Sequence, residues 1–196
     1  MNSNIRPLLS TFVFFLLLTG VAYPLLVTGI GQLFFPQQAN GSLIYKHGQP
    51  VGSKLIGQNF SSEAYFWGRL SATAPYAYNA GLSGGSNLGP LNPALTQEVD
   101  GRVQALHTAD PDNHASIPAD LATSSASGLD PDISQASAEY QINRVAKARQ
   151  LPAAIVQKLV NNHIHPRLFG FLGENRINVL ELNLALDELS SFQPHN

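Results

Sequence analysis

The sequence contains no cysteine. This absence excludes disulfide bonds, thiolate-bound iron–sulfur clusters and thiol nucleophiles from any function of the chain. It is compatible with an oxidising compartment and with a reducing one, so it does not locate the protein. The chain has 196 residues, which is long enough for one compact domain and an additional anchoring segment.

Basic residues are scarce and scattered. Lys and Arg together number 11, and the formal net charge is -2. The one tight basic group is Arg144, Lys147 and Arg149. A surface that binds nucleic acid needs a dense basic face to neutralise phosphates. We therefore expect no nucleic-acid partner.

Charge is absent from a long N-terminal stretch. No residue between Arg6 and Lys46 carries a charge or an imidazole, and residues 8–35 are almost entirely apolar. About 20 apolar residues in a helix cross a hydrocarbon core of about 30 Å. The sequence therefore predicts a cytoplasmic N-terminus over residues 1–7, a transmembrane helix over 8–35 and one soluble domain over 36–196.

Two other interpretations of residues 8–35 are weaker. A cleaved signal peptide has an A-x-A cleavage site, which the sequence lacks, and the apolar run continues well past the small residues at 20–22. A buried helix of a soluble protein would be expected to show some polar face, and this run has none. Pro24 and the glycines at 20, 29 and 31 are tolerated in membrane helices, where glycines let a second helix approach closely.

The orientation of the helix follows from the few positive charges near it. Arg6 and the terminal amine flank its N-terminal end, whereas the first positive charge after it is Lys46. The positive-inside rule then places the N-terminus in the cytoplasm and the soluble domain outside.

The soluble part shows helical signals and few strand signals. Two short apolar pieces within residues 43–56 are split by a turn and predict a hairpin. Ser61 to Glu63 predict the start of a short helix, and residues 68–92, rich in Gly, Ser, Asn and Pro, predict a long ordered loop. Caps and first-turn prolines predict helices over 93–107, 131–149, 152–164 and 179–189, the last with a capping box at Asn178 and Glu181. The expected fold class is α+β: a single, mostly helical soluble domain with a few short strands.

Three adjacent aromatic residues stand before the long loop. Tyr65, Phe66 and Trp67 cannot all face inward on one regular element, because neighbouring side chains point in different directions. We expect them to close the domain core near the membrane-proximal hairpin, with at least one of them surface-exposed and available to a partner; a loop-covered aromatic cluster is the alternative.

No set of residues in the sequence predicts catalysis or metal binding. His163 and His165 lack two further ligands at suitable spacing, and the segment Asp110 to His114 lacks the glycine and the last glutamate of a calcium loop. Ser124, Ser125 and Ser127 stand in no G-x-S-x-G frame. We therefore interpret these histidines as exposed, the acidic segment as a solvated surface loop, and the chain as having no metal of its own.

The most distinctive local signal is the run Ser83, Gly84, Gly85, Ser86 and Asn87. Adjacent glycines flanked by serines can present free backbone N–H groups that cradle a phosphate. Leu82 to Ser86 resembles the LSGGQ loop of ABC-type ATPases, but no Walker A motif accompanies it. Two interpretations stay open: a structural or docking loop, and a nucleotide contact made by residues 83–87.

Five blocks of the sequence together resemble one family. They are GSKLIGQNFSSEAYFWGRLSA (52–72), NAGLSGGSNLGPLNPAL (79–95), IPADLATSSASGLDPDIS (117–134), QINRVAKAR (141–149) and NVLELNLALDEL (178–189). In order and spacing they resemble the signatures of KdpC, the C subunit of the bacterial Kdp potassium-transporting ATPase, which also has a membrane helix before them. Two positions depart from that family's pattern: Leu70 stands where it has proline in GRPSA, and Asp132 where it has histidine in DPHIS.

The resemblance implies a complex in the bacterial inner membrane. Its partners would be a channel-like A subunit, a P-type ATPase B subunit and a small F subunit, besides membrane lipid. A C subunit would be an essential accessory subunit with no catalytic activity of its own. It would act as a catalytic chaperone that supports assembly and raises the ATP affinity of the B subunit, with the loop at Ser83–Asn87 as the suggested nucleotide contact. ATP would then be bound only through the complex.

The predicted orientation conflicts with a direct contact to ATP. ATP is cytoplasmic, whereas the charge pattern places residues 83–87 outside. An effect on nucleotide affinity would then be indirect. The alternative is an extracytoplasmic cap that docks at the potassium entrance of the A subunit.

Overall fold

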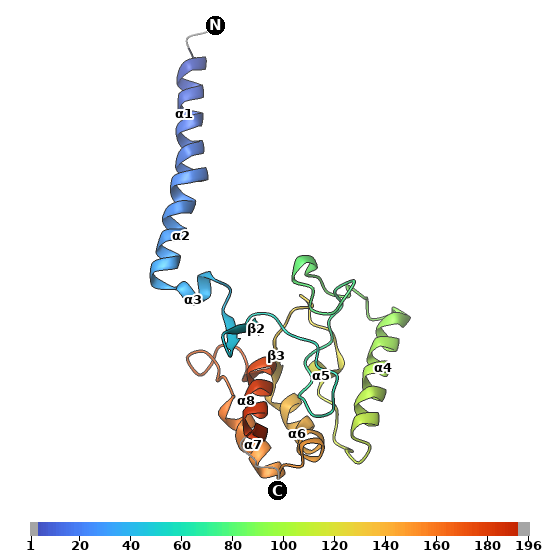
Figure 1. Ribbon diagram of the computed structural model, residues 1–196. Coiled ribbons are helices and arrows are strands. Elements are labelled where there is room, and N and C mark those ends of the chain that lie inside the picture. Colours follow the sequence, from blue (N-terminus) through green and yellow to red (C-terminus); the bar gives the residue numbers. More distant parts are fainter. Residues whose placement is uncertain (1–3, 192–196) are drawn as a thin grey trace. The chain divides into compact units, whose positions relative to one another are not determined.

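The computed structural model describes residues 4–191. It divides the chain into two compact units, Met1–Val51 and Gly52–Asn196, and each is described by itself. The first contains the apolar helix and a hairpin, and the second contains the soluble core (Figure 1).

The N-terminal helix is formed by α1 (Ile5–Leu17), the π-helical segment η1 (Leu18–Ala22) and α2 (Tyr23–Phe34). Together they make one helix of 30 residues that is long and apolar enough to cross a membrane. At about 1.5 Å per residue its length exceeds the roughly 30 Å of a hydrocarbon core. None of its residues is buried within the chain, so its apolar surface is available to lipid or to another helix.

The π-helical segment lies next to Pro24. Proline has no N–H group, so a regular helix would leave the carbonyl four residues before it without a donor. Here the N–H of Tyr23 reaches back five residues to the carbonyl of Leu18, which is the wider spacing of a π-helix. The helix continues through this segment without a break.

A hairpin follows the helix as predicted, but its second strand lies at residues 49–53, where the turn was expected, and not at residues 54–58. A short helix α3 (Pro36–Ala39) precedes β1 (Leu43–Lys46) and β2 (Gln49–Ser53), which pair as a two-stranded sheet. Between the strands His47 and Gly48 both have positive φ, 51° and 77°. Positive φ at both central residues is the requirement of the tight turn that matches strand twist.

The soluble core consists of three helices and a two-stranded sheet. The helices are α6 (Gln135–Arg149), α7 (Ala153–Asn162) and α8 (Val179–Ser191), and the strands are β3 (Asp132–Ser134) and β4 (Arg176–Asn178). The strands pair antiparallel, with Ile133 opposite Ile177, and both side chains are buried among the helices. A second cluster forms where α4 (Pro93–Ala109) and the short α5 (Ala119–Ala122) contribute Leu106 and Leu121. The mixed, mostly helical fold class is thereby confirmed.

The aromatic segment enters this core as extended chain. Phe66 is fully buried in the first cluster and Trp67 belongs to the second, so the two side chains join the clusters. Tyr65 is half-buried and donates its hydroxyl to Asp187. None of the three is fully exposed, so the expected surface-exposed aromatic is reduced to the half-buried Tyr65, and a contact with a partner stays a prediction.

Two buried amides hold the backbone of this segment. Asn183 of α8 accepts from the N–H of Phe66 at 2.9 Å and donates to its carbonyl at 3.0 Å. Gln141 of α6 does the same for Trp67, at 2.8 and 3.1 Å. Each amide takes the place of a neighbouring strand, because its C=O and NH₂ groups satisfy one N–H and one C=O together.

Arg144 completes the network below Trp67. It donates to Gln141 at 2.6 Å and to the carbonyl of Glu63, also at 2.6 Å. Its guanidinium lies 4.5 Å from the centre of the indole ring. Burial lowers the pKa of Arg144 to about 10, so it remains a cation at neutral pH and gains a cation–π contact.

Two expected helix starts are wrong. Ser61 to Glu63 form only a turn, closed by the N–H of Tyr65 and the carbonyl of Ser62. The helix expected from residue 131 begins at Gln135, because residues 132–134 pair with β4 and Ser134 caps the helix instead. The remaining predicted helices are present, with ends shifted by a few residues.

The capping box at α8 is half formed. The side chain of Asn178 accepts from the N–H of Glu181 at 3.1 Å, as the spacing predicts. The Glu181 side chain instead pairs with Lys54, which ties the segment after the hairpin to the start of α8.

Candidate functional site

The predicted loop Ser83–Asn87 lies against a second loop, residues 124–128. The N–H of Gly84 donates to the carbonyl of Ser127 at 2.9 Å, and the Ser83 hydroxyl donates to the same oxygen at 3.0 Å. The hydroxyls of Ser86 and Ser124 lie 3.5 Å apart. The structure thus joins two serine-rich segments that are about 40 residues apart in sequence.

Glycines permit this close approach. A Cβ at Gly85 would lie 2.9 Å from the carbonyl oxygen of Ala126. A Cβ at Gly128 would lie 2.8 Å from the carbonyl oxygen of Gly84, and the φ of Gly128 is +67°. The glycines of the motif therefore have a packing role whether or not the loop binds a ligand. The N–H of Gly84, which the sequence offered as an anion donor, is already engaged.

Ser71 orders the long loop that leads to residues 83–87. Its hydroxyl donates to the carbonyl of Gly128 at 2.6 Å and accepts from the N–H of Tyr78 at 2.9 Å. The Tyr78 hydroxyl donates to the carbonyl of Arg69 at 2.6 Å, and burial raises the pKa of that phenol. The prediction of an ordered loop over residues 68–92 agrees with this network, which crosses the loop at several points.

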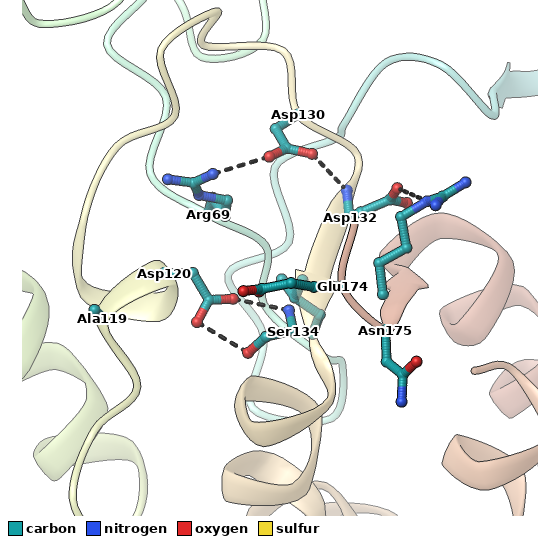
Figure 2. Close-up of a pocket in the computed structure, with 10 residues that line it drawn as sticks. Arg69, Ala119, Asp120, Asp130, Asp132, Ser134, Glu174 and Asn175 are labelled. Atoms are coloured by element: carbon teal, nitrogen blue, oxygen red, sulfur yellow. Dashed lines mark hydrogen bonds and ion pairs between the residues drawn. The ribbon is translucent and has the colours of Figure 1, made fainter. Parts of the chain in front are cut away.

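A cavity of about 470 Å³ opens beside these loops (Figure 2). In it, Arg69 forms an ion pair with Asp130 at 3.0 Å and donates to the carbonyl of Ser124 at 3.3 Å. Arg69 therefore links the cavity to the loop on which residues 83–87 rest. The residues that line the cavity are Arg69, Ala119, Asp120, Asp130, Asp132, Ile133, Ser134, Glu174, Asn175 and Arg176.

Two carboxylates of the cavity have opposite pKa shifts. Burial raises the pKa of Asp132, and the Arg176 guanidinium at 2.9 Å offsets this only in part. Burial also acts to raise the pKa of Asp120, but hydrogen bonds from the Ser134 N–H and from the hydroxyls of Ser137 and Ser134 outweigh it and lower the pKa. Asp120 holds the start of α6 in place, which is a structural role.

The other residues singled out in the sequence do not form a reactive set. The His163 ring bonds to the carbonyl of Leu159, and His165 lies 3.6 Å from Glu181. Residues 4–191 hold no group of three or more His, Cys, Asp or Glu side chains arranged to bind a metal ion. Asp112 is exposed as expected. The expectation that Asp110 is solvated is wrong, because its side chain is buried at the end of α4.

Comparison with known proteins identifies the group to which the chain belongs. The family model described as "K+-transporting ATPase, c chain" matches residues 5–188. The chain belongs to the KdpC family. Among relatives named "Potassium-transporting ATPase KdpC subunit", the protein of Methylococcus capsulatus is 58% identical over 189 residues, 96% of this chain and 100% of its own length. That of Polaromonas naphthalenivorans is 59% identical over 189 residues, with 96% of each chain covered, and that of Herpetosiphon aurantiacus is 58% identical over 191 residues, 97% and 99%.

Leu70 and Asp132, the two positions at which the resemblance departs from the family pattern, have different surroundings: Asp132 lines the cavity, whereas Leu70 bonds to the loop at residue 125. Leu70 accepts from the N–H of Ser125 at 3.1 Å through its carbonyl, a group that proline also possesses. Asp132 pairs with Arg176 and accepts from Asn178 at 3.2 Å. Leu70 thus leaves the loop pairing intact. Asp132 places a carboxylate in the lining of the Arg69 cavity and of a second cavity, of about 330 Å³, and Arg176 also lines both.

Proposed function

We propose that this chain is a non-catalytic accessory subunit of a potassium-transporting ATPase, held in the bacterial inner membrane by its N-terminal helix. The observation that carries the proposal is the family match over residues 5–188, which includes both the apolar helix and the soluble domain. Relatives that match over 96–100% of their own length are named as subunits of this ATPase. Its partners would be the channel-like A, the ATP-hydrolysing B and the small F subunits.

The role we propose is that of a catalytic chaperone, which supports assembly and raises the ATP affinity of the B subunit. Hydrolysis of ATP needs a nucleotide cradle, a metal-holding carboxylate and a positioned nucleophile at one site. Three carboxylates of the Arg69 cavity are already engaged: Asp130 and Asp132 pair with arginines, and Asp120 accepts from the start of α6. If the chain contacts ATP directly, we expect the contact at Ser83, Gly84, Gly85, Ser86 and Asn87. The first and the last of these residues, Ser83 and Asn87, are exposed.

Co-purification tests the proposal. A tagged chain extracted in mild detergent should retain channel-like and ATPase subunits, and the complex should hydrolyse ATP in response to potassium. The matched control is the same tag on the chain lacking residues 5–34, which should lose most of the partners if the helix is an assembly surface. A full-length chain that purifies alone from cells expressing all subunits would contradict the accessory role.

A second candidate role is an extracytoplasmic cap over the potassium entrance of the A subunit. The long loop before α4 exposes three large apolar side chains, Tyr76 at 63%, Leu82 at 60% and Leu91 at 96%. Exposed apolar side chains beside an ordered loop suit contact with another protein. The charge on Arg6 favours the outer location that such a cap requires.

Cysteine labelling separates the two roles, because the chain has no cysteine of its own. Single cysteines at Ser83 and at Asn2 are exposed to a membrane-impermeant thiol reagent in intact cells. Labelling at position 83 alone supports the cap and leaves only an indirect effect on ATP affinity. Labelling at position 2 alone supports direct nucleotide contact by the loop.

A further inference from the structure

A narrow β-finger, residues 165–176, connects α7 to β4. Its base is closed by two backbone bonds between His165 and Arg176, at 2.8 and 3.1 Å, and Arg176 begins β4. Nearer the tip, Leu168 and Leu172 exchange two further bonds, at 2.9 and 3.0 Å. In Figure 1 this segment is the loop that leaves the body of the domain between α7 and α8. The finger is therefore attached through β4 to the buried core.

The tip of the finger is apolar and exposed. Leu168 is 62% exposed, Phe169 78%, Phe171 72% and Leu172 48%, and only Gly170 stands among them. No polar side chain interrupts residues 168–172. Single exposed apolar side chains are ordinary, but four on one tight turn mark a surface that another medium covers.

The N–H groups of the tip are mostly satisfied within the finger. The N–H groups of Leu168, Gly170, Phe171 and Leu172 all donate to carbonyls within the finger, at 2.9, 3.0, 3.3 and 3.0 Å. Four of the five N–H groups of residues 168–172 are thus satisfied without solvent. Backbone that enters lipid must meet its hydrogen bonds internally, whereas a water-exposed loop has no such need.

The tip also has a strained residue. Phe169 has a φ of 53°, a region that bulky side chains rarely occupy. The turn keeps an aromatic ring at its apex where glycine would remove the strain. Strain of this kind persists where the surrounding structure and the function hold it.

We propose that the β-finger inserts its tip, Leu168 to Leu172, into the lipid–water interface of the membrane that holds the N-terminal helix. The proposal rests on the membrane anchoring in the proposed function, which keeps the domain close to a bilayer. Arg167 precedes the tip and is exposed, so it can meet lipid phosphate while the aromatic rings enter the acyl boundary. The finger would act as a second attachment that limits how the domain rotates about its tether.

Lipid is favoured over a protein partner by the composition of the tip. A protein-binding anchor combines apolar side chains with polar groups that pair with the partner and fix the geometry. Residues 168–172 offer only leucine, phenylalanine and glycine, and their N–H groups are mostly engaged. Such a surface lacks the polar groups that would pair with a protein pocket, but its apolar side chains can pack against lipid acyl chains.

Lipid quenching tests the proposal on the full chain. Single cysteines at Phe169, at Leu91 and at Leu17 are labelled with an environment-sensitive fluorophore, and each protein is reconstituted in phosphatidylcholine–phosphatidylglycerol vesicles that contain doxyl-labelled lipid. Leu91 is the matched control, an exposed leucine at 96% on another loop, and Leu17 lies in the membrane helix. We expect about twofold or greater quenching at positions 169 and 17 relative to position 91.

A second variant keeps the test decisive. Replacing Phe171 and Leu172 with serine in the Phe169→Cys protein should remove most of the quenching while the buried Trp67 still reports a folded domain. Quenching at position 17 alone would overturn the lipid contact and leave the anchoring intact. Quenching at none of the positions would overturn the anchoring itself. A label at 169 that becomes inaccessible to aqueous iodide only when the A, B and F subunits are added would assign the finger to a protein partner.

Discussion

The Asn183 side chain should be one of the largest single polar contributions to the stability of the soluble unit. It is 1% exposed, and it pairs with both backbone groups of Phe66, which is fully buried. Asn183→Ala removes the donor and the acceptor at once. Water cannot readily take the place of this donor and acceptor, because residues 66 and 67 are buried between α6 and α8.

The expected loss follows from the two orphaned groups. A buried N–H or C=O that loses its partner costs about 1–3 kcal/mol. Two such groups on Phe66 give a loss of about 2–6 kcal/mol. A domain of this size has about 5–15 kcal/mol of stability in total, so the variant should be close to unfolding in mild denaturant.

The assay uses the single tryptophan of the chain. Trp67 is buried next to Phe66, so its fluorescence reports the loss of this core during urea unfolding in mild detergent. Asn162→Ala, an exposed asparagine at the end of α7, is the control and should change stability by no more than about 0.5 kcal/mol. If Asn183→Ala shifts the midpoint no more than this control does, the argument from the buried amide is wrong.

Three further predictions concern the loops, the cavity and the membrane helix. Gly128→Ala should lower the free energy of unfolding by about 1–3 kcal/mol, because the φ of Gly128 is +67° and a Cβ there would meet a carbonyl oxygen. Gly101→Ala is the control and should not destabilise, because Gly101 lies on α4 with open space around it. Hydrogen exchange of the paired loops compares the two variants. The pKa of Asp120 is lower in the folded protein than in the unfolded chain, where it is about 3.9. The ionised carboxylate therefore stabilises the fold above that pH, and this stabilisation is lost as the pH falls through the folded pKa. Asp120→Asn should therefore lower the melting temperature more at pH 7 than at a pH below the folded pKa of Asp120, and an equal loss at both would refute this. Replacing Gly29 and Gly31 with leucine should weaken complex assembly without preventing insertion, and an unchanged yield of complex would show that the glycines are merely tolerated in lipid.

The sequence predicted the elements that depend on local signals. The charge-free run predicted the apolar helix, and Asn92 predicted the start of α4, where its side chain accepts from Ala94 at 3.0 Å. Asn178 likewise predicted the cap of α8. In each case a short-range interaction fixes the element, so neighbouring residues contain the information.

The elements that depend on distant residues were missed. Residues 132–134 became a strand because Ile133 pairs with Ile177, more than 40 positions away. The turn at Ser61 to Glu63 stays a turn because the chain after it is held extended by Gln141 and Asn183. Contacts with distant residues override the local preference for helix, and the neighbouring sequence does not indicate them.

The candidate site was predicted in part. The sequence singled out Ser83–Asn87, and the structure places these residues on a second serine-rich loop. It gave no sign of the Arg69 cavity, because Arg69, Asp120, Asp130 and Arg176 converge from four separate segments. The block GRLSA held the one usable signal, an arginine two residues before the serine that orders the loop.

We propose that the chain acts on ATP hydrolysis only as an accessory subunit. The most direct measurement is the rate of potassium-stimulated ATP hydrolysis against ATP concentration, for the complex of the other subunits with and without this chain, and for the chain alone. We expect no hydrolysis by the chain alone and a lower KM for ATP when the chain joins the complex. Hydrolysis by the isolated chain, or a KM and a rate that do not change when it is added, would contradict the account.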